Sequence, residues 1–325
     1  MRSDLPAARR STSRRVATTA IVALAALAAA AGWWWTGQDP SRPPRPEPSP
    51  AAPSDPKMLD CSRIVSMAPS ITETLFSLGL GDSVVGVTKY CLYPPEAQQR
   101  TIVGGFYDPN YEAIVGLSPT IVMALPEHAE HSRRLAALGI EVHTVPQATV
   151  DQILASLVDL DAACGLGGPG AVAAEQLRRK LAEVERRTTG RPRPGVLVSV
   201  GREMGNGSLR DIFVAGRGTF YDELVSLAGG TNVYDGRAIQ YPILSTEGLL
   251  RLNPQVVIEI VPELAQRGLT AEAVVRDWES LPGLNAVKER RIHVLTEDYA
   301  VIPGPRFVML LDRLARILHP EIAWE

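Results

Sequence analysis

From residue 62 onward, short runs of aliphatic and β-branched residues alternate with amphipathic stretches. The runs have the length and composition of buried strands, and the stretches repeat apolar residues at helical spacing. The expected strands are Arg63–Met67, Val84–Thr88, Thr120–Ala124, Glu141–Val145, Gly195–Val200, Asp211–Ala215, Gln255–Ile260 and Arg291–Leu295. The expected shorter helices are Ile71–Leu78, Tyr111–Leu117, His131–Leu138, Leu249–Leu252 and Arg306–Leu318. This alternation predicts an α/β fold with parallel sheets.

Residues 172–189 are typical of one long, partly exposed helix between the two sets of strands. Leu177, Leu181 and Val184 share one face of that helix, and charged residues occupy most of the remainder. We therefore predict two Rossmann-like lobes, 58–165 and 191–325, joined by one long connecting helix within 166–190. A ligand cleft is expected between the lobes.

The two halves contain a similar segment. Leu117-Ser-Pro-Thr-Ile-Val122 is echoed 135 residues later by Leu252-Asn-Pro-Gln-Val-Val257. In both places a helix is expected to end just before a proline, and a buried strand follows. An aromatic residue close to a proline precedes each segment, in Phe106-Tyr-Asp-Pro109 and in Gln240-Tyr-Pro242. This pattern suggests related lobes.

The first 35 residues carry an export signal. Residues 1–15 form a basic cytoplasmic region with five arginines, and the 20 residues 16–35 carry no charge. That length suits one crossing of a bilayer, and Trp33–Trp35 suit its interface with water. Cleavage after the small residues Ala28–Ala31 is the alternative interpretation. Either a signal-anchor or a signal peptide places the remaining chain outside the cytoplasm, tethered to the membrane or secreted.

Residues 37–57 contain eight prolines, which favour an extended polyproline II linker. A lipid anchor at Cys61 is not expected, because Asp60 precedes it instead of a small residue.

Composition excludes several function classes. The chain has 33 Lys and Arg against 36 Asp and Glu, so no basic excess indicates nucleic-acid binding. Three cysteines cannot build a disulfide scaffold or a cysteine-based zinc ribbon. Pairing among Cys61, Cys91 and Cys164 stays open, with one left over.

No catalytic motif is evident. Glu127, His128 and His131 lie where a helix begins after an expected strand, so His128 is a weak candidate for touching a ligand or its metal. A metal site needs three or four ligands, and no partner cluster accompanies it. We expect neither a resident metal, nor a catalytic site, nor a cofactor.

Three ordered segments resemble the helical-backbone substrate-binding proteins of ABC importers, nearest the cobalamin-binding branch. They are Arg63-Ile-Val-Ser-Met-Ala-Pro-Ser-Ile-Thr-Glu73, Gly86–Pro95 and Gly104–Glu112. The resemblance covers about residues 62–320 and continues through Tyr241–Glu247 and Pro303–Arg306.

The resemblance implies that one glutamate on each lobe docks onto arginines of the membrane permease, at Glu73 and Glu247. Two separated carboxylates would fix a docking register through charge-assisted pairs. The local alternative is helix capping, because Ser70 and Glu73 have capping-box spacing and Glu247 follows Ser245 in a first helical turn.

The resemblance also implies a ligand cleft lined by aromatic residues, since flat rings suit a macrocycle. Arginines near the cleft would meet carboxylates or amides of the ligand. The expected ligand-binding residues are Tyr90, Phe106, Tyr107, Tyr241, Tyr299, Arg202 and Arg306. This chain departs from the resemblance at Phe106 and Tyr241, where a cobalamin-binding member of the family has tryptophan.

Together these features predict a monomeric binding protein, not an enzyme, that captures a corrinoid and delivers it to an ABC permease. A ferric siderophore or haem is the alternative ligand within the same superfamily. A chelatase-like metal-handling enzyme, which needs a convergent Glu127, His128 and His131, is the alternative from another class. A signalling or scaffold module that uses the fold without transport is a further alternative.

Overall fold

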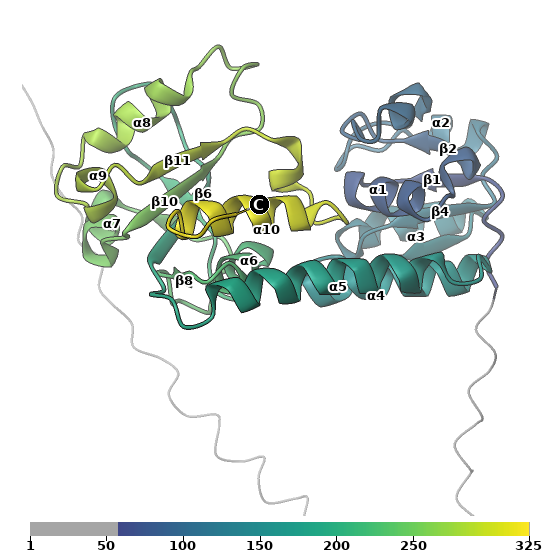
Figure 1. Ribbon diagram of the computed structural model, residues 1–325. Helices are drawn as coiled ribbons and strands as arrows, with labels where there is room; N and C mark the ends of the chain where they lie inside the picture. The colour runs from purple at the N-terminus through teal and green to yellow at the C-terminus, as the bar shows by residue number, and fades with distance from the viewer. Residues whose placement is uncertain (1–57, 325) are drawn as a thin grey trace, which may run out of the picture. The chain divides into compact units, whose positions relative to one another are not determined.

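The computed structural model describes residues 58–324 (Figure 1). The expected basic region, export segment and linker, residues 1–57, lie outside the described residues. Within residues 58–324, no helix is both long enough and apolar enough to cross a membrane.

The N-terminal half is built on a sheet of five parallel strands in the order β3-β2-β1-β4-β5. The central strand β1 pairs with β4 through Val65 and Val122, which are both fully buried. The strands are β1 (Ile64–Ser66), β2 (Val84–Val87), β3 (Thr101–Ile102), β4 (Ile121–Ala124) and β5 (Val142–Thr144). The three inner strands β2, β1 and β4 are almost entirely buried and mostly apolar, as the sequence predicts.

The C-terminal half contains a mixed sheet in the order β11-β10-β6-β7-β9, with β8 also paired to β6. Its strands are β6 (Gly195–Gly201), β7 (Ile212–Val214), β8 (Thr231–Asn232), β9 (Ile243–Leu244), β10 (Val256–Ile260) and β11 (Ile292–Leu295). Strand β7 runs antiparallel to β6 and β9, so the expectation of purely parallel sheets is wrong here. No helix lies between β6 and β7, and parallel neighbours need a long crossover connection.

Ten α-helices occur in the described part of the chain. They are α1 (Pro69–Ser77), α2 (Tyr111–Gly116), α3 (Ala129–Ala137), α4 (Val150–Cys164), α5 (Pro169–Thr188), α6 (Phe220–Leu227), α7 (Thr246–Leu252), α8 (Ala271–Glu279), α9 (Asn285–Lys288) and α10 (Phe307–Leu318). Four 3₁₀ turns accompany them: η1 (Gly81–Ser83), η2 (Pro95–Gln99), η3 (Pro126–His128) and η4 (Asp298–Val301). Helix α4 is not among the helices expected from the sequence, although Thr149 caps its start and Gly165 ends it in a left-handed conformation.

Helix α5 links the two halves, as its periodicity predicts (Figure 1). It packs against α4 of the N-terminal half and against α6 and α10 of the C-terminal half. One hydrophobic cluster runs through these helices and contains core residues of both sheets, such as Ile64 and Val196. The two halves therefore share one core on the side of α5.

The structure shows how the three cysteines pair. Cys61 and Cys164 form a disulfide with a Cα–Cα distance of 5.6 Å, and Cys91 is free and buried. The bond ties the residues before β1 to the end of α4, beside the hydrogen bond from Leu59 N to Ala163 O. Because its sulfur is bonded to Cys164, Cys61 is not available for lipid attachment.

Replacing both cysteines, Cys61→Ser with Cys164→Ser, should lower the free energy of unfolding by roughly 2–5 kcal/mol, because the disulfide restricts the unfolded chain. The bond closes a separation of 103 residues, and long loops gain most from closure. Urea denaturation measures the loss. A reducing agent should destabilise the wild-type chain and leave the double variant unchanged. Equal stability of both proteins would contradict this role.

Candidate ligand-binding site

Tyr90, Phe106 and Tyr107 lie in two loops that follow β2 and β3 at one edge of the N-terminal sheet. The loops are joined by a hydrogen bond from Lys89 N to Gly104 O and by the Lys89–Asp108 ion pair at 3.7 Å. The rings of Phe106 and Tyr107 pack edge to face at 4.7 Å between centroids. Tyr90 and Tyr107 are exposed. The structure thus places an aromatic surface where the sequence predicts one.

A glycine is required at the start of the second loop. Gly104 has a φ of +103°, and a Cβ there would lie 2.5 Å from the Asp108 carbonyl oxygen. Glycine alone adopts this conformation without strain and permits so close an approach. The tight turn carries Phe106 and Tyr107 beyond the end of the sheet.

Tyr241 supplies an aromatic ring to the C-terminal half. Hydrogen bonds from Val214 N to Pro242 O and from Gly216 N to Gln240 O hold its backbone beside β7. The ring is about half exposed, and burial raises the pKa of its hydroxyl, which stays protonated at neutral pH. It lies near Tyr221, whose hydroxyl donates to Ala300 O.

The 135-residue repeat holds in three dimensions. Helices α2 and α7 begin 135 residues apart and each precedes a buried strand, and their N-caps Asn110 and Ser245 both accept a hydrogen bond from the backbone three residues later. The residues that follow the two helical segments, Ser118 and Asn253, both adopt positive φ, at 46° and 44°. At the same offset, Phe106 of one half corresponds to Tyr241 of the other.

The repeat reveals a residue that the sequence analysis missed. Glu247 lies exposed in the first turn of α7, and its equivalent in α2 is Glu112, also exposed in a first turn. Each helix also exposes an aliphatic side chain one turn later, Val115 in α2 and Leu250 in α7. The 135-residue offset, applied to Glu247, was the signal that could have found Glu112.

Glu73 is not on the surface, so its expected role in docking conflicts with its placement. Its side chain is 2% exposed and pairs with Arg306. The local alternative also fails, since α1 begins at Pro69 after Ala68 and has no side-chain cap. Burial raises the pKa of Glu73, although the hydrogen bonds from Arg306 act in the opposite direction.

Arg306 and Tyr299 do not join the aromatic surface in the way the resemblance implies. The Arg306 guanidinium gives its donors to the carboxylates of Glu73 and Asp298. Tyr299 lines a groove of about 670 Å³ between α5 and α10, together with Trp324 and Arg187. Ligand binding by Arg306 and Tyr299 stays a prediction, and the side-chain contacts of both residues argue against it.

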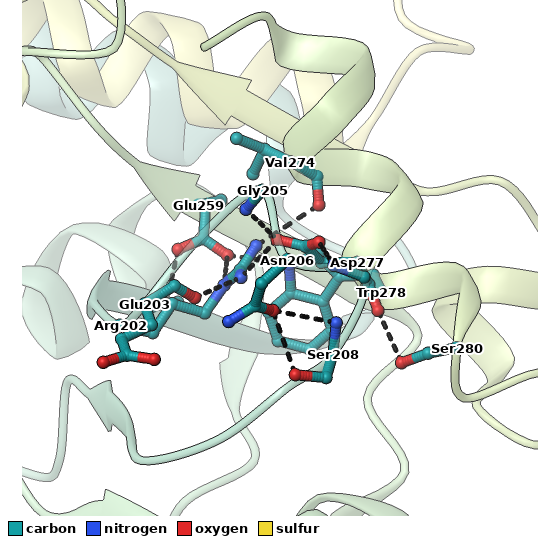
Figure 2. Close-up of polar contacts among 12 residues, drawn as sticks. Arg202, Glu203, Gly205, Asn206, Ser208, Glu259, Val274, Asp277, Trp278 and Ser280 are labelled. Atoms are coloured by element: carbon teal, nitrogen blue, oxygen red, sulfur yellow. Dashed lines mark hydrogen bonds and ion pairs between the residues drawn. The ribbon is translucent and has the colours of Figure 1, made fainter. Parts of the chain in front are cut away.

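Arg202 is fully buried inside the C-terminal half, and four of its five N–H groups donate to the protein (Figure 2). Its Nε donates to Glu259 at 3.0 Å, and its Nη1 donates to Asp277 at 2.8 Å and to the Glu203 carbonyl. Its Nη2 donates to the Val274 carbonyl. The expectation that this guanidinium meets a ligand is therefore at odds with the structure.

The arginine network instead shapes the loop after β6. Asp277 also accepts hydrogen bonds from Gly205 N and Gly207 N, both at 2.7 Å, and these bonds with that of Arg202 lower its pKa although burial opposes the change. Glu259 accepts from Ser199 and from the Trp278 indole. Two carboxylates and one guanidinium thus hold the loop in a single conformation.

His128 lies beneath Phe106, with 4.4 Å between the ring centroids, and is buried. Its Nδ1 accepts from Leu125 N, so Nε2 carries the proton of the neutral ring and has no lone pair for a metal. Burial lowers the pKa of this imidazole. Glu127 is exposed, so the convergent set that a metal-handling enzyme needs is not formed. Residues 58–324 contain no cluster of three or more potential metal ligands.

Residues 64–299 match the family described as periplasmic binding protein. The chain belongs to the periplasmic binding protein family. Membership confirms the family resemblance and the two-lobed α/β fold inferred from the sequence. It also confirms the expectation of a binding protein in place of an enzyme, working outside the cytoplasm.

Several members of the family are similar over nearly their whole length. The vitamin B12-binding protein of Salmonella typhimurium is 30% identical over 79% of this chain and 90% of its own length. The crystal structure of the periplasmic vitamin B12 binding protein BtuF of Vibrio cholerae is 25% identical, with a TM-score of 0.67 over 80% of this chain and 97% of its own. The periplasmic heme-binding protein RhuT from Roseiflexus sp. RS-1 is 27% identical, with a TM-score of 0.66 over 80% and 98%.

Arg202→Met should lower the free energy of unfolding of this periplasmic binding protein by roughly 3–5 kcal/mol, because two buried carboxylates lose their shared cation. Chemical denaturation measures the change. Arg210→Met, at an exposed position eight residues later, is the control and should change stability by less than about 0.5 kcal/mol. Similar small losses in both variants would show that the network is not holding the loop.

Proposed function

We propose that this chain is the substrate-binding protein of an ABC importer and that its solute is a corrinoid. The observation that carries the proposal is the pair of repeat-related aromatic rings, Phe106 and Tyr241, one in each half. Tyr90 and Tyr107 extend the apolar surface on the N-terminal side. Flat rings from two walls suit a large macrocycle, because they offer contact area at low entropy cost. Relatives named as vitamin B12-binding proteins support the choice of ligand.

Haem is the second candidate, since it too is a flat metal-containing macrocycle. Roseiflexus RhuT, a heme-binding protein, is about as similar to this chain as Vibrio BtuF. We favour the corrinoid, because haem carries propionates that require cationic partners, and the two arginines expected near the ligand are engaged by the protein. The Arg202 and Arg306 guanidinium groups are committed to carboxylates of the protein.

We further propose that the permease-docking acids are Glu112 and Glu247. Both are exposed, both lie in a first helical turn, and the repeat relates them by its 135-residue offset. Two equivalent acidic helices suit a partner that presents two equivalent basic sites, such as a pair of identical permease subunits. In this proposal Glu112 replaces Glu73.

Delivery to a permease also requires the protein to reach the outer side of the membrane. We propose that residues 16–35 provide this location, as an anchor or as an export signal, and that residues 37–57 form the linker. The disulfide at Cys61 suits an oxidising compartment.

Cyanocobalamin should bind the purified protein one to one in a calorimetric titration. Phe106→Ala and Tyr241→Ala should each weaken binding roughly tenfold or more, because central aromatic contacts dominate binding energy. Leu138→Ala, at an exposed position on the C-terminal side of α3, is the control and should bind normally. Binding of haemin with no response to cyanocobalamin would assign the site to haem.

Glu112→Ala and Glu247→Ala should leave the affinity for the ligand unchanged and reduce ligand uptake in cells that express the importer. The two carboxylates are expected to pair with the permease, where a lost charge-assisted contact weakens association. Glu272→Ala removes another exposed acid from a first helical turn, in α8, and should transport normally. Full transport by the Glu112 and Glu247 variants would rule out this docking pair.

A further inference from the structure

An ion pair joins the two halves beside the loop that carries Tyr90. Arg306, which precedes α10, donates from Nε to Glu73 Oε2 at 3.0 Å and from Nη2 to Glu73 Oε1 at 2.6 Å. Glu73 belongs to α1, and the N-terminal end of α10 points toward that helix in Figure 1. Two parallel hydrogen bonds make this contact directional as well as strong.

The pair is largely buried, and burial destabilises a charged side chain that has no partner of opposite charge. The exposed fractions of the two side chains are 13% for Arg306 and 2% for Glu73. On one face the guanidinium packs over the Tyr93 ring, 3.9 Å from its centroid. A charge with this little water is strongly destabilised once its partner leaves. The N-terminal half therefore buries an acid whose counter-ion belongs to the other half.

The two halves approach each other closely at this point. A Cβ at Gly304 would lie 3.2 Å from Glu73 Oε2 and 3.3 Å from Ser70 Cα. On its own side, Arg306 is oriented by Asp298, which accepts from Nη1 at 3.0 Å and from Nη2 at 2.7 Å. The bidentate fork thus meets Glu73 in one geometry, which defines the position of one half against the other.

The pair is also connected to the aromatic residues of both halves. Tyr93 is part of the loop that carries Tyr90. On the C-terminal side, Asp298 begins the turn η4, in which the carbonyl of Ala300 accepts from Tyr221, the neighbour of Tyr241. The pair therefore contacts, directly or through one turn, the segments that carry aromatic residues of both halves.

We propose that Glu73 and Arg306 are positioning residues that hold the two halves at the separation in which Phe106 and Tyr241 contact one ligand. Neither side chain touches the ligand. This role rests on the solute-binding function proposed above. Helix α5 and the hydrogen bond from Val150 N to Glu223 link the halves elsewhere, and the ion pair limits the remaining freedom between them.

The first measurement needs no ligand. Spin labels on the full chain, at Arg133→Cys in α3 and Arg276→Cys in α8, report the distance between the halves by double electron–electron resonance. Glu73→Gln should shift or broaden the distance distribution, because it keeps the size of the side chain and removes the charge. Glu130→Gln, which breaks an exposed ion pair within α3, is the control and should leave the distribution unchanged.

The second measurement is the affinity for cyanocobalamin. Glu73→Gln should weaken binding roughly tenfold, the size of a typical coupling between contacting residues. The double variant Glu73→Gln with Arg306→Gln should lose no more affinity than whichever single variant binds cyanocobalamin less tightly. Both changes remove the same contact. Arg306→Lys keeps the charge without the fork, should show a smaller distance change, and serves where Glu73→Gln does not fold.

The outcomes separate this proposal from the proposed function. A shifted distance in Glu73→Gln without any cyanocobalamin binding by the wild-type chain supports the positioning role and overturns the corrinoid assignment. A wild-type distance distribution in both Glu73→Gln and Arg306→Lys overturns the positioning role, whatever the chain binds. Additive losses of affinity in the double variant overturn it as well.

Discussion

The apolar face of α5 is the constraint on which the remaining structure depends. Twenty residues form this helix, which spans about 30 Å at 1.5 Å per residue. Leu177 and Leu181 pack into the hydrophobic cluster that contains core residues of both sheets. Because one continuous helix belongs to both cores, the halves cannot separate without exposing apolar surface. The distance between the aromatic rings of the two halves therefore follows first from this packing.

Buried arginines then fix parts of the structure that the hydrophobic core does not position. Arg202 and Arg306 each hold two carboxylates, the first within one half and the second across both. A guanidinium has five donors in a rigid plane, so a buried arginine orders every acceptor around it. The loop after β6 and the approach of Gly304 to α1 are both organised in this way. The cations that the sequence suggested for the ligand serve the architecture of its site.

In the proposed function, the internal repeat links ligand binding to docking on the permease. At one offset it relates Phe106 to Tyr241 and Glu112 to Glu247, so each half carries an aromatic ring and, six residues later, an exposed acid. Each acid lies in a helix that begins with a side-chain N-cap and is followed by a residue with positive φ. A protein with this arrangement presents its solute and its two acids in a constant relation. That property suits transfer to a partner with two-fold symmetry.

The sequence by itself determined the eight main strands, their order and the long helix, because strand and helix periodicity and turn residues are local signals. The eight expected strands and the long helix all occur within a few residues of their expected bounds. Only the tertiary structure decided the direction of β7, the disulfide between Cys61 and Cys164, and the burial of Glu73, Arg202 and Arg306. These features depend on residues far apart in the chain, and a charged residue gives no local sign of whether water or a distant partner will satisfy it.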